Sequence, residues 1–125
     1  MADQRCILVV EDGRDLRELV VDVLEGEGYR VTEASDSDAA ITLIDGPAHF
    51  DLLFTDVVMP GRLNGFLLGA YAVQRRPALK VLYTTGYTSL VPPGLREPIL
   101  KKPWRMSDLL GAIDRVLGDL SAPDA

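Results

Sequence analysis

Acidic residues directly follow two of the most apolar runs in this sequence of 125 residues. Glu11 and Asp12 come after "CILVV", and Asp56 comes after "DLLFT". A carboxylate beside so much hydrophobic surface costs stability unless a cation or a metal ion compensates its charge. Two other apolar runs lead into a hydroxyl pair, Thr84-Thr85, and a lysine pair, Lys101-Lys102. These acids, hydroxyls and ammonium groups are the candidate functional residues.

The chemistry that this set suits is phosphoryl transfer assisted by a metal ion. Three carboxylates held close together repel one another, so at least one pKa rises unless a cation is present. An oxygen-only cluster partly open to water suits a hard divalent ion, and Mg²⁺ fits best. A carboxylate can then attack phosphorus to form an acyl phosphate, while cations neutralise the transferred oxygens. The sequence has no glycine-rich ATP loop, and its single histidine, His49, is expected at the surface rather than on zinc.

Short apolar segments are the expected strands that carry these residues. Four are almost continuously hydrophobic, which is typical of strands buried on both faces of a parallel sheet. A fifth alternates more and is expected nearer an edge of the sheet. The four are Cys6–Val10, Asp51–Phe54, Lys80–Gly86 and Pro98–Pro103, and the alternating one is Tyr29–Ala34.

Helical patterns separate the strands. Their apolar residues recur every three or four positions, with capping or breaking residues at the ends. Alternation of strands and helices predicts an α/β fold, in which right-handed crossovers cover both faces of a parallel sheet. Ligands bind beyond the carboxyl ends of such strands, where the candidate residues lie. The expected helices are Leu16–Leu24, ended by Gly26 and Gly28; one after the N-cap candidates of Ser35–Asp38; Asn64–Arg76, ended by Pro77; and one from a cap at Ser107 to Leu120.

The segment from Tyr87 to Pro98 interrupts this alternation. A helix is expected between the last two strands, but Pro92, Pro93 and Gly94 break the pattern. We therefore predict that the helix at this position is shortened or replaced by a loop.

Length and composition limit the classes of function. The chain is long enough for one domain, residues 1–125 with a core of about 5–120, and hydrophobic residues make up 47% of it. The net charge of -6 argues against a nucleic-acid partner. No segment has transmembrane length and the first residues do not resemble a signal peptide, so no membrane association and a cytoplasmic location are expected. The single cysteine, Cys6, is expected in the core.

Four motifs in register resemble the receiver domain of two-component response regulators. They are "VVEDGRDLRELV", "DLLFTDVVMPG", "VLYTTGY" and "LKKPW", and the resemblance covers essentially the whole chain. It implies the flavodoxin-like, doubly wound fold with five parallel strands in the order 2-1-3-4-5. The "YTTGYT" run and the shortened fourth-helix region look like receivers of hybrid histidine kinases, or their stand-alone single-domain relatives.

The resemblance also assigns a role to each site residue. Asp56 would be the phospho-acceptor, Thr85 the switch hydroxyl beside Gly86, and Lys102 the ion-pair partner of carboxylate and phosphate. A cis peptide would join Lys102 to Pro103. The Mg²⁺ ligands would be Asp12 and Asp56 directly, Glu11 mainly through water, and the main-chain carbonyl of Val58. Asp12 could also cap the first helix.

The implied function is Mg²⁺-dependent acceptance of a phosphoryl group from a histidine kinase or a histidine-phosphotransfer protein. Phosphorylation would then change binding to an unknown downstream protein. Such a protein is not an enzyme in the usual sense, although it assists its own phosphorylation and dephosphorylation. Many receivers carry an aromatic residue three positions before the lysine, but this sequence has Ile99 there. Tyr87 is a candidate to take over part of the signalling role.

Two other functions stay open from the residues alone. The first is an interaction module with a receiver-like fold that does not depend on phosphorylation, which the missing aromatic residue would fit. The second is an aspartate-nucleophile phosphatase. Enzymes of the haloacid dehalogenase type carry a second acid two residues after the nucleophile, where this sequence has Val58, and it also lacks a cap insertion.

Overall fold

The computed structural model describes residues 4–86 and 91–121. Strands and helices alternate along the described chain until β4, which is followed by β5 and then by the last helix. The elements are β1 Cys6–Val10, α1 Arg14–Gly26, β2 Arg30–Ala34, α2 Ser37–Asp45, β3 Leu52–Asp56, α3 Gly65–Arg75, β4 Lys80–Thr85, β5 Ile99–Lys101 and α4 Met106–Ser121.

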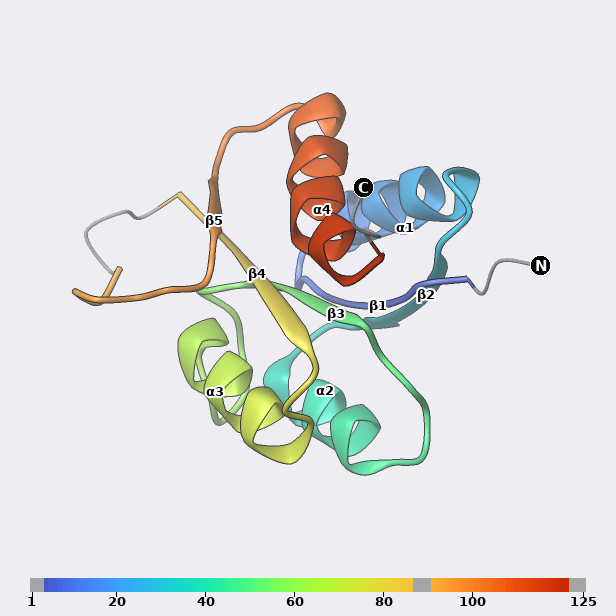
Figure 1. The fold of residues 1–125 in the computed structure, drawn as a ribbon. Helices are drawn as coiled ribbons and strands as arrows, with labels where there is room; N and C mark the ends of the chain where they lie inside the picture. The colour runs from blue at the N-terminus through green and yellow to red at the C-terminus, as the bar shows by residue number, and fades with distance from the viewer. Residues whose placement is uncertain (1–3, 87–90, 122–125) are drawn as a thin grey trace.

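The strands form one parallel sheet in the order β2-β1-β3-β4-β5. Helices α1 and α4 cover one face, and α2 and α3 cover the other (Figure 1). The predicted α/β fold and strand order are confirmed, as is the edge position of the alternating strand Arg30–Ala34. The carboxyl ends of all five strands therefore lie along one rim of the sheet.

Each face of the sheet packs on its own hydrophobic cluster, and this explains the continuous apolar runs. Along β1, Leu8 and Val10 belong to the cluster under α2 and α3, whereas Ile7 and Val9 belong to the cluster under α1 and α4. All five residues of β3 are buried, because this strand lies in the centre of the sheet. Side chains of a strand alternate between faces, so a strand covered on both sides needs apolar residues at every position.

The start of α2 follows a predicted capping residue, the start of α3 has a cap that was not predicted, and the start of α4 differs from the prediction. The Asp36 carboxylate accepts a hydrogen bond from the Ala39 N–H, and the Asn64 side chain accepts one from the Leu67 N–H. The expected cap at Ser107 is wrong, because α4 already begins at Met106. There the Asp108 carboxylate accepts a hydrogen bond from the Arg105 N–H, which fixes an earlier start.

The connection between β4 and β5 contains no helix in its described part, residues 91–98. This agrees with the loop that Pro92, Pro93 and Gly94 predict. Tyr87, the candidate signalling residue, lies outside the described residues. Within residues 4–86 and 91–121, no helix is both long and apolar enough to cross a membrane.

Candidate functional site

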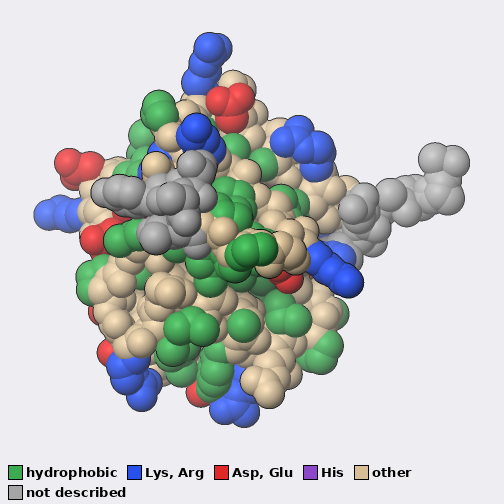
Figure 2. All heavy atoms as spheres, turned by 90° about the vertical axis from the view of Figure 1, so that its left-hand side faces the viewer, with side chains coloured by type: hydrophobic (Ala, Val, Ile, Leu, Met, Phe, Trp, Pro, Cys, Tyr) green, Lys and Arg blue, Asp and Glu red, His purple; other side chains and the backbone are tan. Residues whose placement is uncertain are grey.

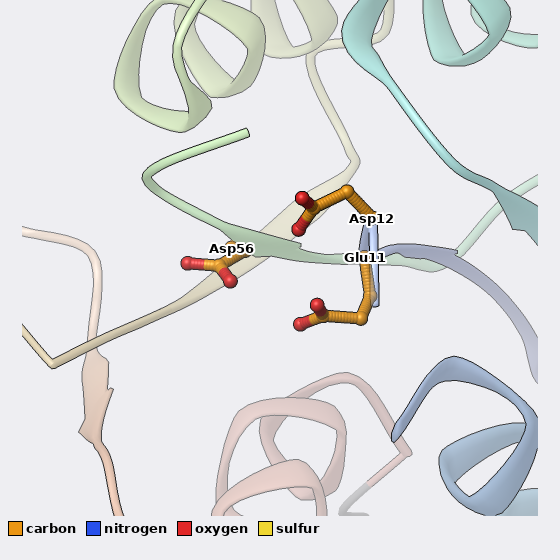
Figure 3. A group of neighbouring side chains, drawn as sticks. All are labelled: Glu11, Asp12 and Asp56. Atoms are coloured by element: carbon orange, nitrogen blue, oxygen red, sulfur yellow. The ribbon is translucent and has the colours of Figure 1, made fainter. Parts of the chain in front are cut away.

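Three carboxylates meet at the carboxyl rim of the sheet. Asp56 is the last residue of β3, and Glu11 and Asp12 follow the neighbouring strand β1. One oxygen of each side chain lies within 4.8 Å of an oxygen of the other two. Figure 3 shows the three side chains projecting to the same side from the strand ends. Glu11 and Asp56 are buried whereas Asp12 is exposed, so the cluster opens to water on the Asp12 side.

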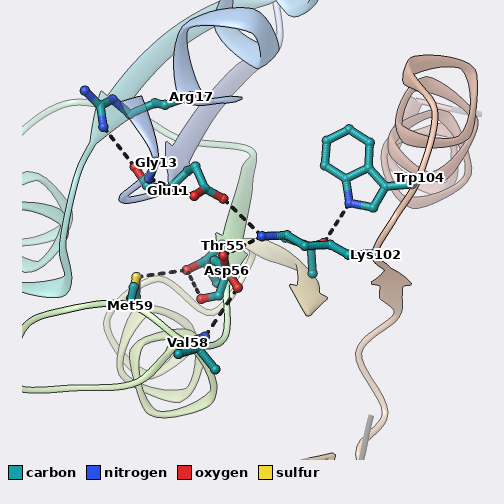
Figure 4. A network of polar contacts seen from close by, with 10 residues as sticks. Glu11, Gly13, Arg17, Thr55, Asp56, Val58, Met59, Lys102 and Trp104 are labelled. Atoms are coloured by element: carbon teal, nitrogen blue, oxygen red, sulfur yellow. Dashed lines mark hydrogen bonds and ion pairs between the residues drawn. The ribbon is translucent and has the colours of Figure 1, made fainter. Parts of the chain in front are cut away.

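Lys102 joins this cluster from the end of β5. Its Nζ lies 2.7 Å from Asp56 Oδ2 and 3.5 Å from Glu11 Oε1 (Figure 4). The Lys102 N–H donates to the Thr85 carbonyl at 3.0 Å, which continues the β4–β5 ladder up to the site. The neighbouring Lys101 is exposed, and the Lys102–Pro103 peptide is cis as predicted.

The cluster shifts the titration of two of its members. Burial raises the pKa of Glu11 above its usual range, although a hydrogen bond from the Gly13 N–H and the charge of Lys102 oppose this rise. Burial alone would lower the pKa of Lys102, but the carboxylates of Asp56 and Glu11 outweigh it and raise that pKa. Lys102 is therefore firmly protonated at neutral pH.

The backbone after β3 holds the Asp56 carboxylate in place. The Val58 N–H donates to Asp56 Oδ1 at 3.3 Å, and the Gly65 N–H donates to the Val57 carbonyl at 2.8 Å. A Cβ at Gly65 would overlap the Asp56 carbonyl oxygen, so the start of α3 packs directly against the strand end. The main-chain carbonyl of Val58 as a metal ligand stays a prediction.

The two threonines at the end of β4 have different surroundings. Both are buried, and Thr84 pairs with Asp56 in the ladder. The Trp104 indole N–H donates to Thr84 Oγ1 at 2.8 Å, and its ring packs edge-on against Phe54. Trp104 ends the motif "LKKPW", but the motif did not predict this hydrogen bond. The signals that could have indicated it are an indole N–H two residues after Lys102 and a second hydroxyl, that of Thr84, next to Thr85.

Other residues lie where the sequence placed them or away from the site. Gly13 is the N-cap of α1, so Asp12 keeps its carboxylate free of that capping role. His49 is exposed and contacts the Asp51 carboxylate, at the opposite end of β3 from Asp56. Ile99 is half-buried and packs against the cluster that contains Tyr83, its partner in the ladder.

The donor set fits a hard divalent cation. All three candidate ligands are carboxylates, and the exposed Asp12 leaves room for the water that Mg²⁺ retains in proteins. One ammonium group faces three acids, so Lys102 leaves the cluster negatively charged when the acids are ionised. A divalent ion would compensate that charge.

Comparisons with known proteins agree with one another. Residues 7–114 match the response regulator receiver domain. The chain is 34% identical over 116 residues to the response regulator receiver protein CpdR of Brucella abortus, covering 89% of this chain and 95% of CpdR. It is 36% identical over 119 residues to the transcriptional regulatory protein CpxR of Escherichia coli, covering 94% of this chain but only 40% of CpxR. The solved receiver domain of the hybrid histidine kinase CckA superposes with a TM-score of 0.77 at 29% identity, covering 90% of this chain and 98% of that one.

Proposed function

Because the chain belongs to the response regulator receiver family, we propose that Asp56 is the residue that accepts its phosphoryl group. Receivers act in two-component signalling as phospho-acceptors rather than as classical enzymes. The observation that carries the assignment is the position of Asp56. It is a buried carboxylate at the end of the central strand β3, held by Lys102 and grouped with two further acids.

The proposed reaction is attack by an Asp56 carboxylate oxygen on the phosphorus of a phosphohistidine. The new O–P bond forms an acyl phosphate, the P–N bond breaks, and the electron pair of that bond returns to the imidazole of the donor. The donor is a histidine kinase or a histidine-phosphotransfer protein. The Val58 N–H contact with Asp56 Oδ1 and the Lys102 contact with Oδ2 hold the carboxylate in one orientation. Orientation of this kind removes entropy cost from the transfer step.

Glu11, Asp12 and Asp56 would hold Mg²⁺, with the Val58 carbonyl as a further ligand. When bound, the ion supplies positive charge that offsets the charge on the transferred phosphoryl oxygens. Lys102 supplies a second positive charge from the end of the edge strand β5, and its raised pKa keeps it protonated. Asp12 is exposed, so it can exchange water for a metal ion at little desolvation cost.

Thr85 is the proposed switch residue. It is the last residue of β4, its side chain is buried, and its carbonyl accepts the Lys102 N–H. A hydroxyl at this point could donate to a phosphoryl oxygen on Asp56 and so couple phosphorylation to the β4–β5 edge. The family resemblance favours Thr85 over Thr84, because Thr85 directly precedes the small residue Gly86. Phosphorylation would shift the population between two conformers and thereby change binding to a downstream protein. A cytoplasmic location remains a prediction that accompanies this function.

Intact mass measured after incubation with a small acyl-phosphate donor tests the assignment. Wild type with Mg²⁺ should gain one phosphoryl group, while wild type with a chelator and Asp56→Asn should gain none. Asp51→Asn is a matched control, because Asp51 lies just before the other end of β3 and should leave the adduct unchanged. An adduct that persists in Asp56→Asn would refute the acceptor. A full yield of adduct in the chelator would refute the metal site.

A further inference from the structure

A groove lies at the β5 edge of the sheet, away from the carboxylate cluster. Its volume is about 490 Å³, and it runs between α3, the first half of β4, and α4. The groove exists because β5 is only three residues long whereas β4 has six. The β4–β5 ladder begins at Tyr83 and Ile99, so the first three residues of β4 have no neighbour in β5.

The backbone of Val81 faces this open edge. The Lys80 N–H donates to the Asp51 carbonyl beside β3, and the Tyr83 N–H donates to the Pro98 carbonyl on the other side. Because backbone groups alternate between the two sides of a strand, those of Val81 point away from β3. Pro98 has no N–H to offer to the Val81 carbonyl. Within the described residues, the Val81 backbone therefore has no strand partner on this side.

The groove combines an apolar floor with a positively charged border. Its floor includes Val73 and Val116, which lie on α3 and α4 on opposite faces of the sheet. Its charged residues are the exposed Lys80, Arg96 and Arg115 and one half-buried acid, Glu97, so cations outnumber acids three to one. Among the described residues, none of these three cations has a carboxylate within 4.0 Å. Figure 2 shows this face, with Lys and Arg side chains and several Asp and Glu side chains around a central area of hydrophobic and uncharged atoms.

We propose that this groove binds an extended segment of a partner protein in which acidic and apolar residues alternate. The segment would add to the sheet as a strand, exchanging backbone hydrogen bonds with Val81. Its apolar side chains would fill the floor, and its carboxylates would face Lys80, Arg96 and Arg115. Positive charge at this edge of a chain with net charge -6 favours an acidic partner.

A second copy of the chain is the less suitable occupant. Two copies that paired through the same edge would be related by a two-fold axis, which brings identical surfaces together. The cations of one copy would then face the same cations of the other, and like charges at an interface oppose association. An acidic segment meets no such repulsion.

Selection of binders from a display library of random short peptides tests the proposal. The selected peptide is synthesised with a fluorescent label, and its Kd is measured by anisotropy at low and high salt. Arg115→Glu should weaken binding about tenfold, because an attractive charge pair becomes a repulsive one. Arg30→Glu is the matched control, since it makes the same charge change on β2 at the opposite edge of the sheet. Both exposed substitutions should leave thermal unfolding and phosphoryl acceptance as in wild type.

Hydrogen exchange of backbone amides tests whether the peptide binds by strand addition. Strand addition should slow exchange of the Val81 amide at least tenfold when the peptide is bound, and the selected sequences should alternate Asp or Glu with Val or Ile. The proposal fails if no peptide is enriched, if Arg115→Glu binds as tightly as Arg30→Glu, or if exchange at Val81 does not change. A dimer of the protein alone that excludes the peptide would place a second copy in the groove and overturn the assigned occupant.

Discussion

Replacing Lys102 by methionine should destabilise the fold through the two buried acids that the lysine contacts. Methionine keeps much of the apolar stem but removes the ammonium group. Glu11 and Asp56, whose side chains are each 8% exposed, would then lose a cation that lies 3.5 Å and 2.7 Å away, respectively. The sheet would hold two buried carboxylates beside a third, exposed acid with no compensating charge.

The size of this effect follows from the geometry. At an effective dielectric constant near 20, an ion pair at 2.7 Å is worth roughly 6 kcal/mol before desolvation is subtracted. Removing one partner of a buried pair typically costs about 3–5 kcal/mol. The Lys102 side chain is 29% exposed and water reaches Asp12, and both weaken the interaction. We therefore expect the free energy of unfolding of Lys102→Met to fall by about 2 kcal/mol. Asp56→Asn removes a charge from the crowded cluster, and its free energy of unfolding should fall by less than about 0.5 kcal/mol or rise.

Urea unfolding followed by circular dichroism, at neutral pH with a chelator, measures these differences. Lys101→Met is the control, because Lys101 is exposed and should lie within about 0.5 kcal/mol of wild type. In the double variant Lys102→Met/Asp56→Asn, the loss should be smaller than the sum of the single changes by about 1.5 kcal/mol, since only one buried acid remains uncompensated. Equal stability of the two lysine variants, or strict additivity in the double variant, would refute the reasoning.

Three further predictions concern the surroundings of the site. Burial raises the pKa of Tyr83 to about 12, whereas the unfolded chain titrates near its ordinary value of about 10. The folded state therefore binds more protons between these values, and the free energy of unfolding should fall as pH rises from about 10 to 12. Unfolding curves recorded at alkaline pH should show a smaller fall in the free energy of unfolding for Tyr83→Phe than for wild type. Gly65→Ala should lower the thermal midpoint and the yield of phosphorylated protein, because its Cβ would overlap the Asp56 carbonyl; equal midpoints would contradict this packing. Thr84→Val should shift the emission of Trp104, the sole tryptophan, by removing the 2.8 Å hydrogen bond of its indole, and an unchanged spectrum would exclude that contact in solution.

The sheet could be predicted because its sequence signal is strong and local. Continuous apolar runs identify strands that must be covered on both faces, and β1 has the predicted bounds of Cys6–Val10. The end of a strand is harder to predict when it depends on pairing with a residue that is distant in the sequence. β3 extends to Asp56 because that residue pairs with Thr84, and no local pattern near Phe54 indicates this. Asp56 is therefore part of β3 and not of the turn that follows the strand.

The site could be predicted as a set of residues but not as a set of contacts. Placing Asp56, Asp12 and Glu11 together requires only parallel strands with neighbouring carboxyl ends. The Trp104–Thr84 hydrogen bond depends on how the chain turns after Pro103, which residue types do not determine. Likewise, Ser107 is an acceptable N-cap by residue type, but α4 begins at Met106, and Asp108 in its first turn accepts a hydrogen bond from the Arg105 N–H.

The two sides of the site differ in how firmly the sheet holds them, and this indicates where a response to phosphorylation should occur. Asp56 lies on the central strand, which pairs with β1 on one side and β4 on the other. Lys102 follows an edge strand that forms only three ladder pairs. Segments with few cooperative contacts are the ones that open at low free-energy cost. A phosphoryl group on Asp56 would attract Lys102, so we expect β5 to move relative to β3 rather than the reverse. That movement would alter the Ile99 end of the groove beside Val81, where a partner segment is proposed to bind.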